Sequence, residues 1–216
     1  MKTNYYMAAV DLTDRRCLVV GGGELALEKI EGLLACGALV RVVAAEACTG
    51  VSELAERGAV EWEALQYRSS DLDDNFLVIA ATPDMELNEA VHRDAESRSM
   101  LVNVVDVPRL CNFIAPAIVR LGPVAIAIST AGASPALAVR MKNEIAAAFG
   151  PEYGTLALIL NEIRDWAKAV LPTYEDRKSF FDAIVYGRPD PIELLRGGRE
   201  GEVRELIARA QEEAES

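Results

Sequence analysis

Residues 17–29 read CLVVGGGELALEK, and the rest of the chain is best understood from this junction. An apolar run typical of a β-strand meets three consecutive glycines, and strong helix formers begin at Glu24. Inside a regular element each glycine costs roughly 0.5–1 kcal/mol relative to alanine, so three in a row need a physical reason. We infer that something bulky and negatively charged approaches the backbone at this turn.

The segments that follow repeat the alternation of strand and helix. Strands are predicted at 39–45, 60–67, 76–82 and 100–106, in addition to 17–20, and helices at 24–36, 52–57 and 85–98. Strand, helix, strand at this spacing predicts parallel strands joined by right-handed crossovers. We therefore predict an α/β domain with a doubly wound parallel sheet over residues 1–113.

The pattern changes after Pro116. Residues 118–130 predict an antiparallel hairpin around Gly122-Pro123, and Ser134-Pro135 is typical of a helix start, here of a helix through residue 148. Helices are then expected at 155–170 and 174–186, followed by a Gly/Arg-rich break and a short charged helix. We predict a small α+β region over 114–150 and a helical C-terminal domain over 151–216.

Composition narrows the class of protein. The chain has 216 residues, 51% apolar and 26% charged, as expected of a globular protein, and its net charge of −12 argues against general nucleic-acid binding. No apolar run approaches the ~20 residues that span a bilayer. The N-terminal stretch has one lysine before its apolar part and acidic residues directly after it, unlike a secretory signal. We expect a cytoplasmic protein that binds neither nucleic acid nor membranes.

The residue types that usually hold metals are sparse. The four cysteines form no C-x-x-C pair, and the single histidine, His92, is distant from them in sequence, so no resident metal site is predicted. We interpret the cysteines as small core residues of a reduced protein and His92 as a surface or helix-packing residue.

One segment of the acidic chain is locally positive. Residues 114–150 carry three basic side chains, Arg120, Arg140 and Lys142, against one acidic side chain, Glu144. The excess could receive an anionic substrate, or it could be chance at such small numbers.

The glycines fit a nucleotide-binding pattern. Gly21, Gly23 and Ala26 match G-x-G-x-x-A between a strand and a helix. In this arrangement the first glycine makes a tight turn, the second lets a pyrophosphate approach, and the small third residue lets helix and strand pack closely. The alternative is a turn that is merely tight.

The end of the second predicted strand bears on the choice of nucleotide. An acidic residue there usually accepts hydrogen bonds from the ribose of NAD, and Glu46 stands slightly late for that role. The only nearby arginine, Arg41, lies inside the strand, so NAD is favoured over NADP. Alternatively, Glu46 is a solvated loop carboxylate. Thr82, at the end of the fourth strand, is a further candidate contact to the cofactor.

Asp106 is the candidate general base. It ends an apolar strand, and Pro108 stops the strand from continuing. A carboxylate at the carboxyl end of a parallel strand lies at the mouth of the ligand crevice, where it could accept a proton from a substrate. The alternative is an aspartate that caps a turn.

Four stretches together carry a family resemblance: VGGGELALEK (20–29), LNEAVHRDAESR (87–98), NVVDVPRLCNFIAP (103–116) and ISTAGASPALAVRMK (128–142). In this order they resemble the precorrin-2 dehydrogenase/sirohydrochlorin ferrochelatase module of siroheme synthases. The resemblance implies a Rossmann domain, a central dimerisation region, a helical C-terminal domain and a homodimer. It also implies oxidation of precorrin-2 to sirohydrochlorin with NAD and, in many members, insertion of Fe(II) to give siroheme.

The resemblance also assigns roles to residues. It implies that Asp106 serves both activities and that Thr130 lies at the edge of the active site, where some members have serine, while Ala131 replaces a neighbouring glycine. The complete set of expected cofactor contacts is Gly21, Gly22, Gly23, Glu24, Leu25, Ala45, Glu46 and Thr82. Arg120, Arg140 and Lys142 are expected to pair with substrate carboxylates.

The resemblance also bears on the metal ion and on methylation. The metal ion is expected to be a transient substrate. The methyltransferase domain of some siroheme synthases has no counterpart, so methylation is expected from another protein. The rival interpretation is a non-catalytic module that binds NAD or a tetrapyrrole. Asp106→Ala separates the two, because a sensor has no need of a base.

Overall fold

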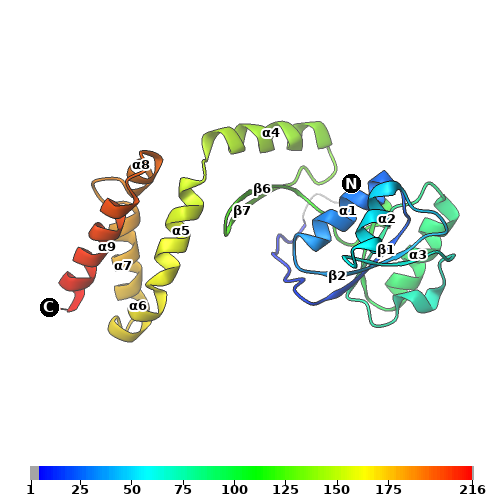
Figure 1. Cartoon of the computed structure of the whole chain (residues 1–216), viewed down its shortest axis with the longest axis horizontal. Coiled ribbons are helices and arrows are strands. Elements are labelled where there is room, and N and C mark those ends of the chain that lie inside the picture. Colours follow the sequence, from blue (N-terminus) through cyan, green and yellow to red (C-terminus); the bar gives the residue numbers. More distant parts are fainter. Residues whose placement is uncertain (1–4, 216) are drawn as a thin grey trace. The chain divides into compact units, whose positions relative to one another are not determined.

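A computed structural model describes residues 5–215, and the chain divides into two compact units, one ending at Ala115 and the other beginning at Pro116. The first unit is built on a parallel five-stranded sheet in the order β3-β2-β1-β4-β5. Figure 1 labels β1 and β2 of this sheet and the helices α1, α2 and α3 around it. Its strands are β1 (Arg16–Val20), β2 (Leu39–Val43), β3 (Glu61–Glu63), β4 (Leu77–Ala80) and β5 (Leu101–Val104). This order confirms the predicted doubly wound, Rossmann-type fold, with the reversal of strand order beside β1.

Helices bury both faces of this sheet. Helices α1 (Glu24–Leu34) and α2 (Thr49–Glu56) share a core with Cys17 and Val19 of β1. Helix α3 (Met85–Ser97) and the 3-10 turn η1 (Ser69–Leu72) share a second core with Leu18 and Val20. Successive strand residues point to opposite faces, so a strand covered on both sides is apolar throughout. This explains the continuous apolar runs of β1 and β4.

The second unit begins with the predicted hairpin. Strands β6 (Ala117–Leu121) and β7 (Val124–Ile128) pair antiparallel, and α4 (Pro135–Ala148) packs on them through Ala138. Ser134 caps α4 as predicted, because its hydroxyl accepts a hydrogen bond from the Leu137 N–H at 3.2 Å.

Helices complete the second unit, around a core that includes Leu156, Phe180 and Val203. They are α5 (Glu152–Glu162), α6 (Arg164–Val170), α7 (Tyr174–Val185), α8 (Pro191–Arg196) and α9 (Glu200–Glu215). No helix within residues 5–215 is long and apolar enough to cross a membrane.

Several predicted boundaries were wrong in the first unit. Helix α2 begins at Thr49 rather than at residue 52. Strand β3 covers only three of the residues predicted at 60–67, because the chain turns back on itself where the Leu65 N–H bonds the Glu63 carbonyl at 2.8 Å. Strand β5 ends at Val104, so Asp106 lies two residues beyond it, at φ +60°.

Two helix predictions were also wrong in the second unit. The helix predicted over 155–170 starts earlier and is two helices, α5 and α6, interrupted at Ile163. The predicted Gly/Arg-rich break contains α8, because the Asp190 carboxylate accepts from the Ile192 N–H at 2.8 Å and Pro191 occupies the first helical position.

Gly154 is expected to be essential for packing α5 against the hairpin. A Cβ at this buried glycine would collide with the Leu121 carbonyl and lie 3.2 Å from the Gly122 nitrogen. We therefore predict that Gly154→Ala lowers the free energy of unfolding by about 1–3 kcal/mol, although alanine favours helix. Urea unfolding followed by circular dichroism measures this loss. The control is Gly201→Ala in α9, where an added Cβ meets nothing within 4 Å. An equal loss in both variants would contradict the packing argument.

Candidate functional site

The first two glycines of the junction are required by the protein's own packing. Gly21 has φ +122°, and a Cβ there would collide with the Ala81 carbonyl oxygen. A Cβ at Gly22 would collide with the Glu46 carbonyl oxygen and lie 2.9 Å from the Ala47 Cα. The turn after β1 therefore packs closely against the chain segments that follow β4 and β2.

Gly23 differs from Gly21 and Gly22, because no contact within the protein requires a glycine at this position. An added Cβ would meet no atom within 4 Å, and the residue is exposed. It is the N-cap of α1, and its φ of −82° is open to any residue. A glycine with free space beside it is what a ligand that approaches the backbone requires.

The same turn offers positive charge to that ligand. No side chain caps α1, so the N–H groups of its first turn are not bonded by a capping residue. The helix dipole adds a positive potential at this end. Ala26 is fully buried under the turn, as the small third position of the motif requires, whereas Glu24 and Leu25 are exposed on it. The turn fits the pyrophosphate of a dinucleotide in both shape and charge.

The segment after β2 borders this turn. Ala44 is held at both backbone groups: its N–H donates to the Glu63 carbonyl at 3.2 Å, and its carbonyl accepts from the Trp62 indole at 3.0 Å. Ala45 and Glu46 follow it and are exposed. The Glu46 backbone thus lies against Gly22, and its role as ribose acceptor stays a prediction.

The segment after β4 is held by a residue that the sequence analysis missed. Asn88 of α3 is only 2% exposed. Its amide nitrogen donates to the Thr82 carbonyl at 3.0 Å, and its oxygen accepts from the Thr82 hydroxyl at 2.9 Å. The Thr82 hydroxyl is thus engaged within the protein, and its cofactor contact stays a prediction. An asparagine on the apolar face of α3, beside Val91 and Ala95, was the sequence signal.

Asp106 lies at the same edge of the sheet as the glycine turn, since both follow the carboxyl ends of parallel strands. It is exposed and stands in a turn that the Val107 N–H closes on the Val104 carbonyl at 3.1 Å. The 3-10 turn η2 (Pro108–Leu110) follows. Its φ of +60° is unfavourable for most residues but tolerated by aspartate.

The remaining predicted site residues all belong to the second unit. The Thr130 hydroxyl donates to the Ser134 carbonyl at 3.1 Å and accepts from the Ser134 N–H at 3.2 Å, so it shapes the loop before α4. Ala131, in the same loop, has φ +52°, which suits the glycine it replaces better than an alanine. The catalytic role of Thr130 stays a prediction.

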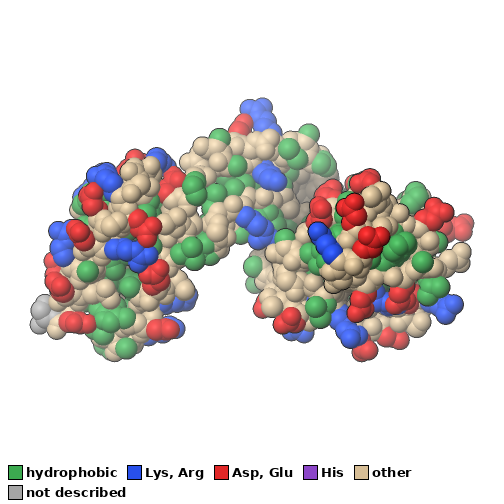
Figure 2. All heavy atoms as spheres, in the orientation of Figure 1, with side chains coloured by type: hydrophobic (Ala, Val, Ile, Leu, Met, Phe, Trp, Pro, Cys, Tyr) green, Lys and Arg blue, Asp and Glu red, His purple; other side chains and the backbone are tan. Residues whose placement is uncertain are grey.

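The three predicted substrate-binding cations are exposed on β6 and α4. Arg140 forms an ion pair of 2.7 Å with Glu144, one helical turn away. Acidic and basic side chains are interspersed over the first unit and the C-terminal helices, whereas the α4 and hairpin region shows mostly apolar and basic side chains (Figure 2). Substrate binding by Arg120, Arg140 and Lys142 stays a prediction.

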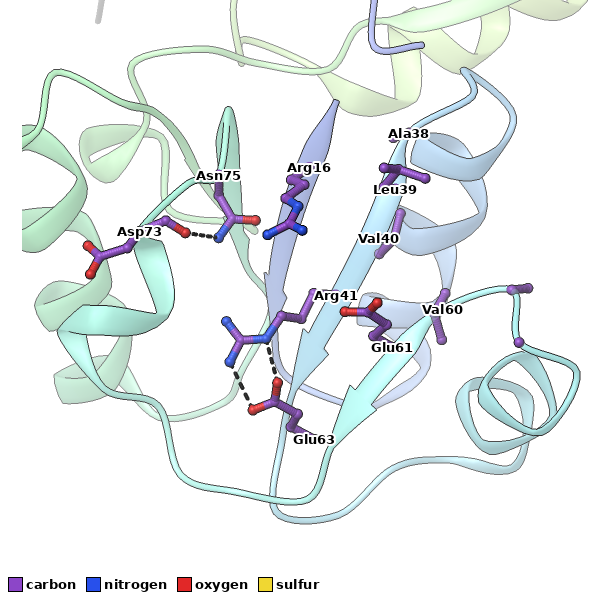
Figure 3. A pocket seen from close by; sticks show the side chains of 12 residues that line it. Arg16, Ala38, Leu39, Val40, Arg41, Val60, Glu61, Glu63, Asp73 and Asn75 are labelled. Atoms are coloured by element: carbon purple, nitrogen blue, oxygen red, sulfur yellow. Dashed lines mark hydrogen bonds and ion pairs between the residues drawn. The ribbon is translucent and has the colours of Figure 1, made fainter. Parts of the chain in front are cut away.

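A hollow of about 420 Å³ lies elsewhere on the first unit (Figure 3). Its lining includes Arg16 and Leu39, the first residues of β1 and β2, so it opens away from the glycine turn. Arg41 in this hollow bonds the Glu63 carboxylate at 2.7 and 2.8 Å and the Asp71 carboxylate at 2.9 Å. The Arg41 guanidinium is therefore already bonded to two carboxylates of the protein.

This ion pair predicts a pH-dependent contribution to stability. The Arg41 guanidinium, through its hydrogen bonds, holds the pKa of the Glu63 carboxyl below its usual value of 4.5. A lowered folded-state pKa stabilises the fold above the unfolded-state pKa, and the contribution disappears as the pH falls below 4.5. We expect Glu63→Gln to lower the free energy of unfolding at neutral pH by about 1 kcal/mol or less, because the pair is partly exposed.

Urea unfolding at several pH values measures that difference. It should shrink towards zero in acid, where the wild-type carboxyl is protonated. Glu61→Gln is the control, since the described residues show no ion pair for Glu61. A difference that is constant across pH would contradict the assignment of the effect to the Arg41–Glu63 pair.

Among residues 5–215 no group of three or more His, Cys, Asp or Glu side chains is placed to hold a metal ion. Asp106 and the glycine turn share one edge of the sheet, where each follows the carboxyl end of a parallel strand. This combination allows proton removal from a substrate next to a redox cofactor.

Comparison with known families covers most of the chain. Residues 8–117 match the family described as "Putative NAD(P)-binding". Residues 122–148 match "Sirohaem biosynthesis protein central", and residues 152–210 match "Sirohaem synthase dimerisation region".

Individual proteins agree with these families. The siroheme synthase of Methylococcus capsulatus is 38% identical over 207 residues, which is 96% of this chain and 44% of that protein. The siroheme synthase of Pseudomonas entomophila is 42% identical over 187 residues, or 87% of this chain and 40% of that protein. The chain thus spans less than half the length of these curated relatives.

A solved structure matches along its whole length. The structure of "SirC, precorrin-2 dehydrogenase" superposes with a TM-score of 0.75 at 26% identity, covering 95% of this chain and all of that one. With three successive family regions and this structural match, the chain belongs to the family that comprises precorrin-2 dehydrogenases and the corresponding module of siroheme synthases.

Proposed function

We propose that this protein is an NAD-dependent precorrin-2 dehydrogenase that forms sirohydrochlorin in siroheme biosynthesis. One observation carries the proposal: Gly23 leaves open space at the positive end of α1, in a chain that matches a precorrin-2 dehydrogenase along that protein's entire length. The open space fits the approach of a dinucleotide pyrophosphate, and the match supplies the substrate class.

The oxidation removes two electrons and two protons from the tetrapyrrole. Bound NAD accepts one hydrogen with both electrons, as hydride. The second hydrogen leaves as a proton, and Asp106 is the residue that we propose to accept it. Its exposed position at the carboxyl edge of the sheet leaves the carboxylate accessible to a substrate. Arg120, Arg140 and Lys142 are proposed to pair with the substrate's carboxylates, and Thr130 to contribute at the site's edge.

The first unit's segments around the glycine turn are proposed to hold the cofactor. The Gly21–Gly23 backbone and the first turn of α1 receive the pyrophosphate, and Ala45 with Glu46 receives the adenosine ribose. NAD is preferred over NADP in this proposal, because Arg41 is already bonded to two carboxylates.

We also propose a cytoplasmic homodimer divided into the three parts 1–113, 114–150 and 151–216. The match of residues 152–210 to a dimerisation region supports the dimer. So does α4, which exposes 48% of Leu137, 53% of Val139 and 39% of Met141. Sedimentation velocity tests this proposal, and a monomer at all accessible concentrations would contradict it.

The function is tested by anaerobic incubation of the protein with enzymatically made precorrin-2 and NAD. Absorbance should show NADH and sirohydrochlorin appearing in equal amounts. If NAD binds but neither product forms, the protein is a non-catalytic binding module. Replacing NAD by NADP in the same assay tests the cofactor preference.

Insertion of Fe(II) into sirohydrochlorin is the second proposed step. The family resemblance motivates it, and Fe(II) enters as a substrate. Adding Fe(II) to the completed first reaction should convert the sirohydrochlorin spectrum into that of siroheme faster than in a protein-free control. Equal rates with and without protein would remove the chelatase activity from the proposal.

A further inference from the structure

Cys111 lies directly beneath the turn that carries Asp106. The side chain is buried, with 4% exposure. Its sulfur lies 3.3 Å from the Val104 nitrogen and 3.2 Å from the Val104 carbonyl oxygen. It also lies 3.4 Å from the Val107 carbonyl oxygen. Val104 and Val107 are the two ends of the turn, so one thiol contacts both.

The turn needs such support for two reasons. Asp106 has φ +60°, a left-handed conformation that is sparsely populated even though aspartate tolerates it better than most residues. Strand β5 is at the edge of the sheet, where outward-facing backbone groups have no strand partner. Asn112 bonds this edge at Val102, with its side-chain oxygen 2.8 Å from the Val102 nitrogen. Cys111 serves Val104 in the same way.

A smaller apolar side chain would break this arrangement. Alanine at position 111 would leave the N–H of Val104, a residue only 1% exposed, without the sulfur that it contacts. Among the hydrogen bonds of residues 5–215, the closing bond from the Val107 N–H to the Val104 carbonyl would then be the one that joins the end of β5 to the end of the turn. The Asp106 carboxylate would occupy a wider range of positions.

We propose that Cys111 is a positioning residue that holds the Asp106 turn in its reactive geometry. The thiol does this as a neutral group, accepting from the Val104 N–H and donating its own hydrogen to a backbone carbonyl. The inference rests on the proposed function, because positioning affects turnover only if Asp106 accepts the substrate's proton. It adds a residue that the sequence analysis interpreted only as part of the core.

Three variants test the proposal. Cys111→Ala removes the sulfur contacts, whereas Cys111→Ser keeps a donor and an acceptor at nearly the same place. Cys17→Ala is the matched control, because Cys17 is also fully buried in the first unit but lies at the start of β1, where its sulfur is 3.7 Å from the Arg15 carbonyl. It loses the same side-chain volume without touching the turn.

For Cys111→Ala we expect kcat to fall about 10- to 100-fold, because small displacements of a catalytic group have effects of this size. KM for NAD should stay within about twofold of wild type, since the glycine turn is unaffected. Cys111→Ser should recover most of kcat, and Cys17→Ala should keep it. An unchanged kcat in folded Cys111→Ala would overturn the proposal, and so would an equal loss in Cys17→Ala.

Hydrogen exchange of the Val107 amide provides a readout that needs no substrate. Its exchange should be faster in Cys111→Ala than in wild type, and close to wild type in Cys111→Ser and Cys17→Ala. If the protein does not oxidise precorrin-2, the proposed function fails, while this comparison still decides whether Cys111 holds the turn. Unaltered Val107 exchange in Cys111→Ala would show that it does not.

Discussion

Gly23→Ala is expected to weaken NAD binding roughly 100-fold while leaving the fold intact. The protein itself tolerates a Cβ at this position, since no atom lies within 4 Å of it. Alanine is a poorer N-cap than glycine, but we expect a stability cost of less than about 1 kcal/mol. In the proposed complex, the pyrophosphate of NAD occupies the space that the methyl group would fill. We expect overpacking and lost phosphate hydrogen bonds to weaken NAD binding by about 3 kcal/mol, or roughly 100-fold.

NAD titration by calorimetry, together with urea unfolding, measures both quantities for this variant. Gly22→Ala is the matched comparison, because its Cβ would collide with the Glu46 backbone. That variant should lose stability as well as NAD binding. If Gly23→Ala binds NAD as tightly as wild type does, the open space is not the cofactor site.

Asp106→Asn is expected to lower the kcat of precorrin-2 oxidation by about 100- to 10,000-fold, the usual contribution of a general base. NAD affinity should be unchanged, because Asp106 is separate from the glycine turn in the chain. Asparagine is preferred to alanine as the replacement for a physical reason. The residue has φ +60°, which asparagine tolerates and alanine does not, so Asp106→Asn removes the base without straining the turn.

Initial rates of NADH formation at saturating NAD measure this loss, and NAD titration provides the control. Asp106→Ala should lose as much activity and some stability in addition, owing to its backbone conformation. Full activity in Asp106→Asn would eliminate the carboxylate as the base. Undetectable turnover in wild type, with intact NAD binding, would favour the non-catalytic module instead.

Much of the fold could be predicted from local pattern. The apolar runs of β1 and β4 follow from burial on both faces of the sheet. Gly21 and Gly22 follow from the close packing of the turn between β1 and α1. Boundaries were less predictable, because they depend on where the chain meets its neighbours. Glu61–Glu63 pairs with β2, but the residues after it turn away, although the apolar residues among them suggested a longer strand.

Those candidate site residues whose type is unusual at their position could be predicted from the sequence. The glycines and Asp106 are such residues, because three glycines rarely separate a strand from a helix and a carboxylate rarely ends an apolar strand. Asn88 and Cys111 could not be predicted in this way, because their roles depend on the backbone groups that they contact. Asn88 contacts Thr82, and Cys111 contacts Val104 and Val107. These contacts depend on how strands and loops pack in the folded protein, and a local sequence pattern carries no information about that packing.

The sequence alone therefore determined the class of this protein: a doubly wound domain with a nucleotide turn, an acidic residue at its edge, and helices after a hairpin. These properties depend on the order and periodicity of residue types. Only the tertiary structure separated Gly23, which the protein's own packing does not require, from Gly21 and Gly22, which that packing demands. The reason is steric, since the space beside a Cα is set by chain segments far away in sequence.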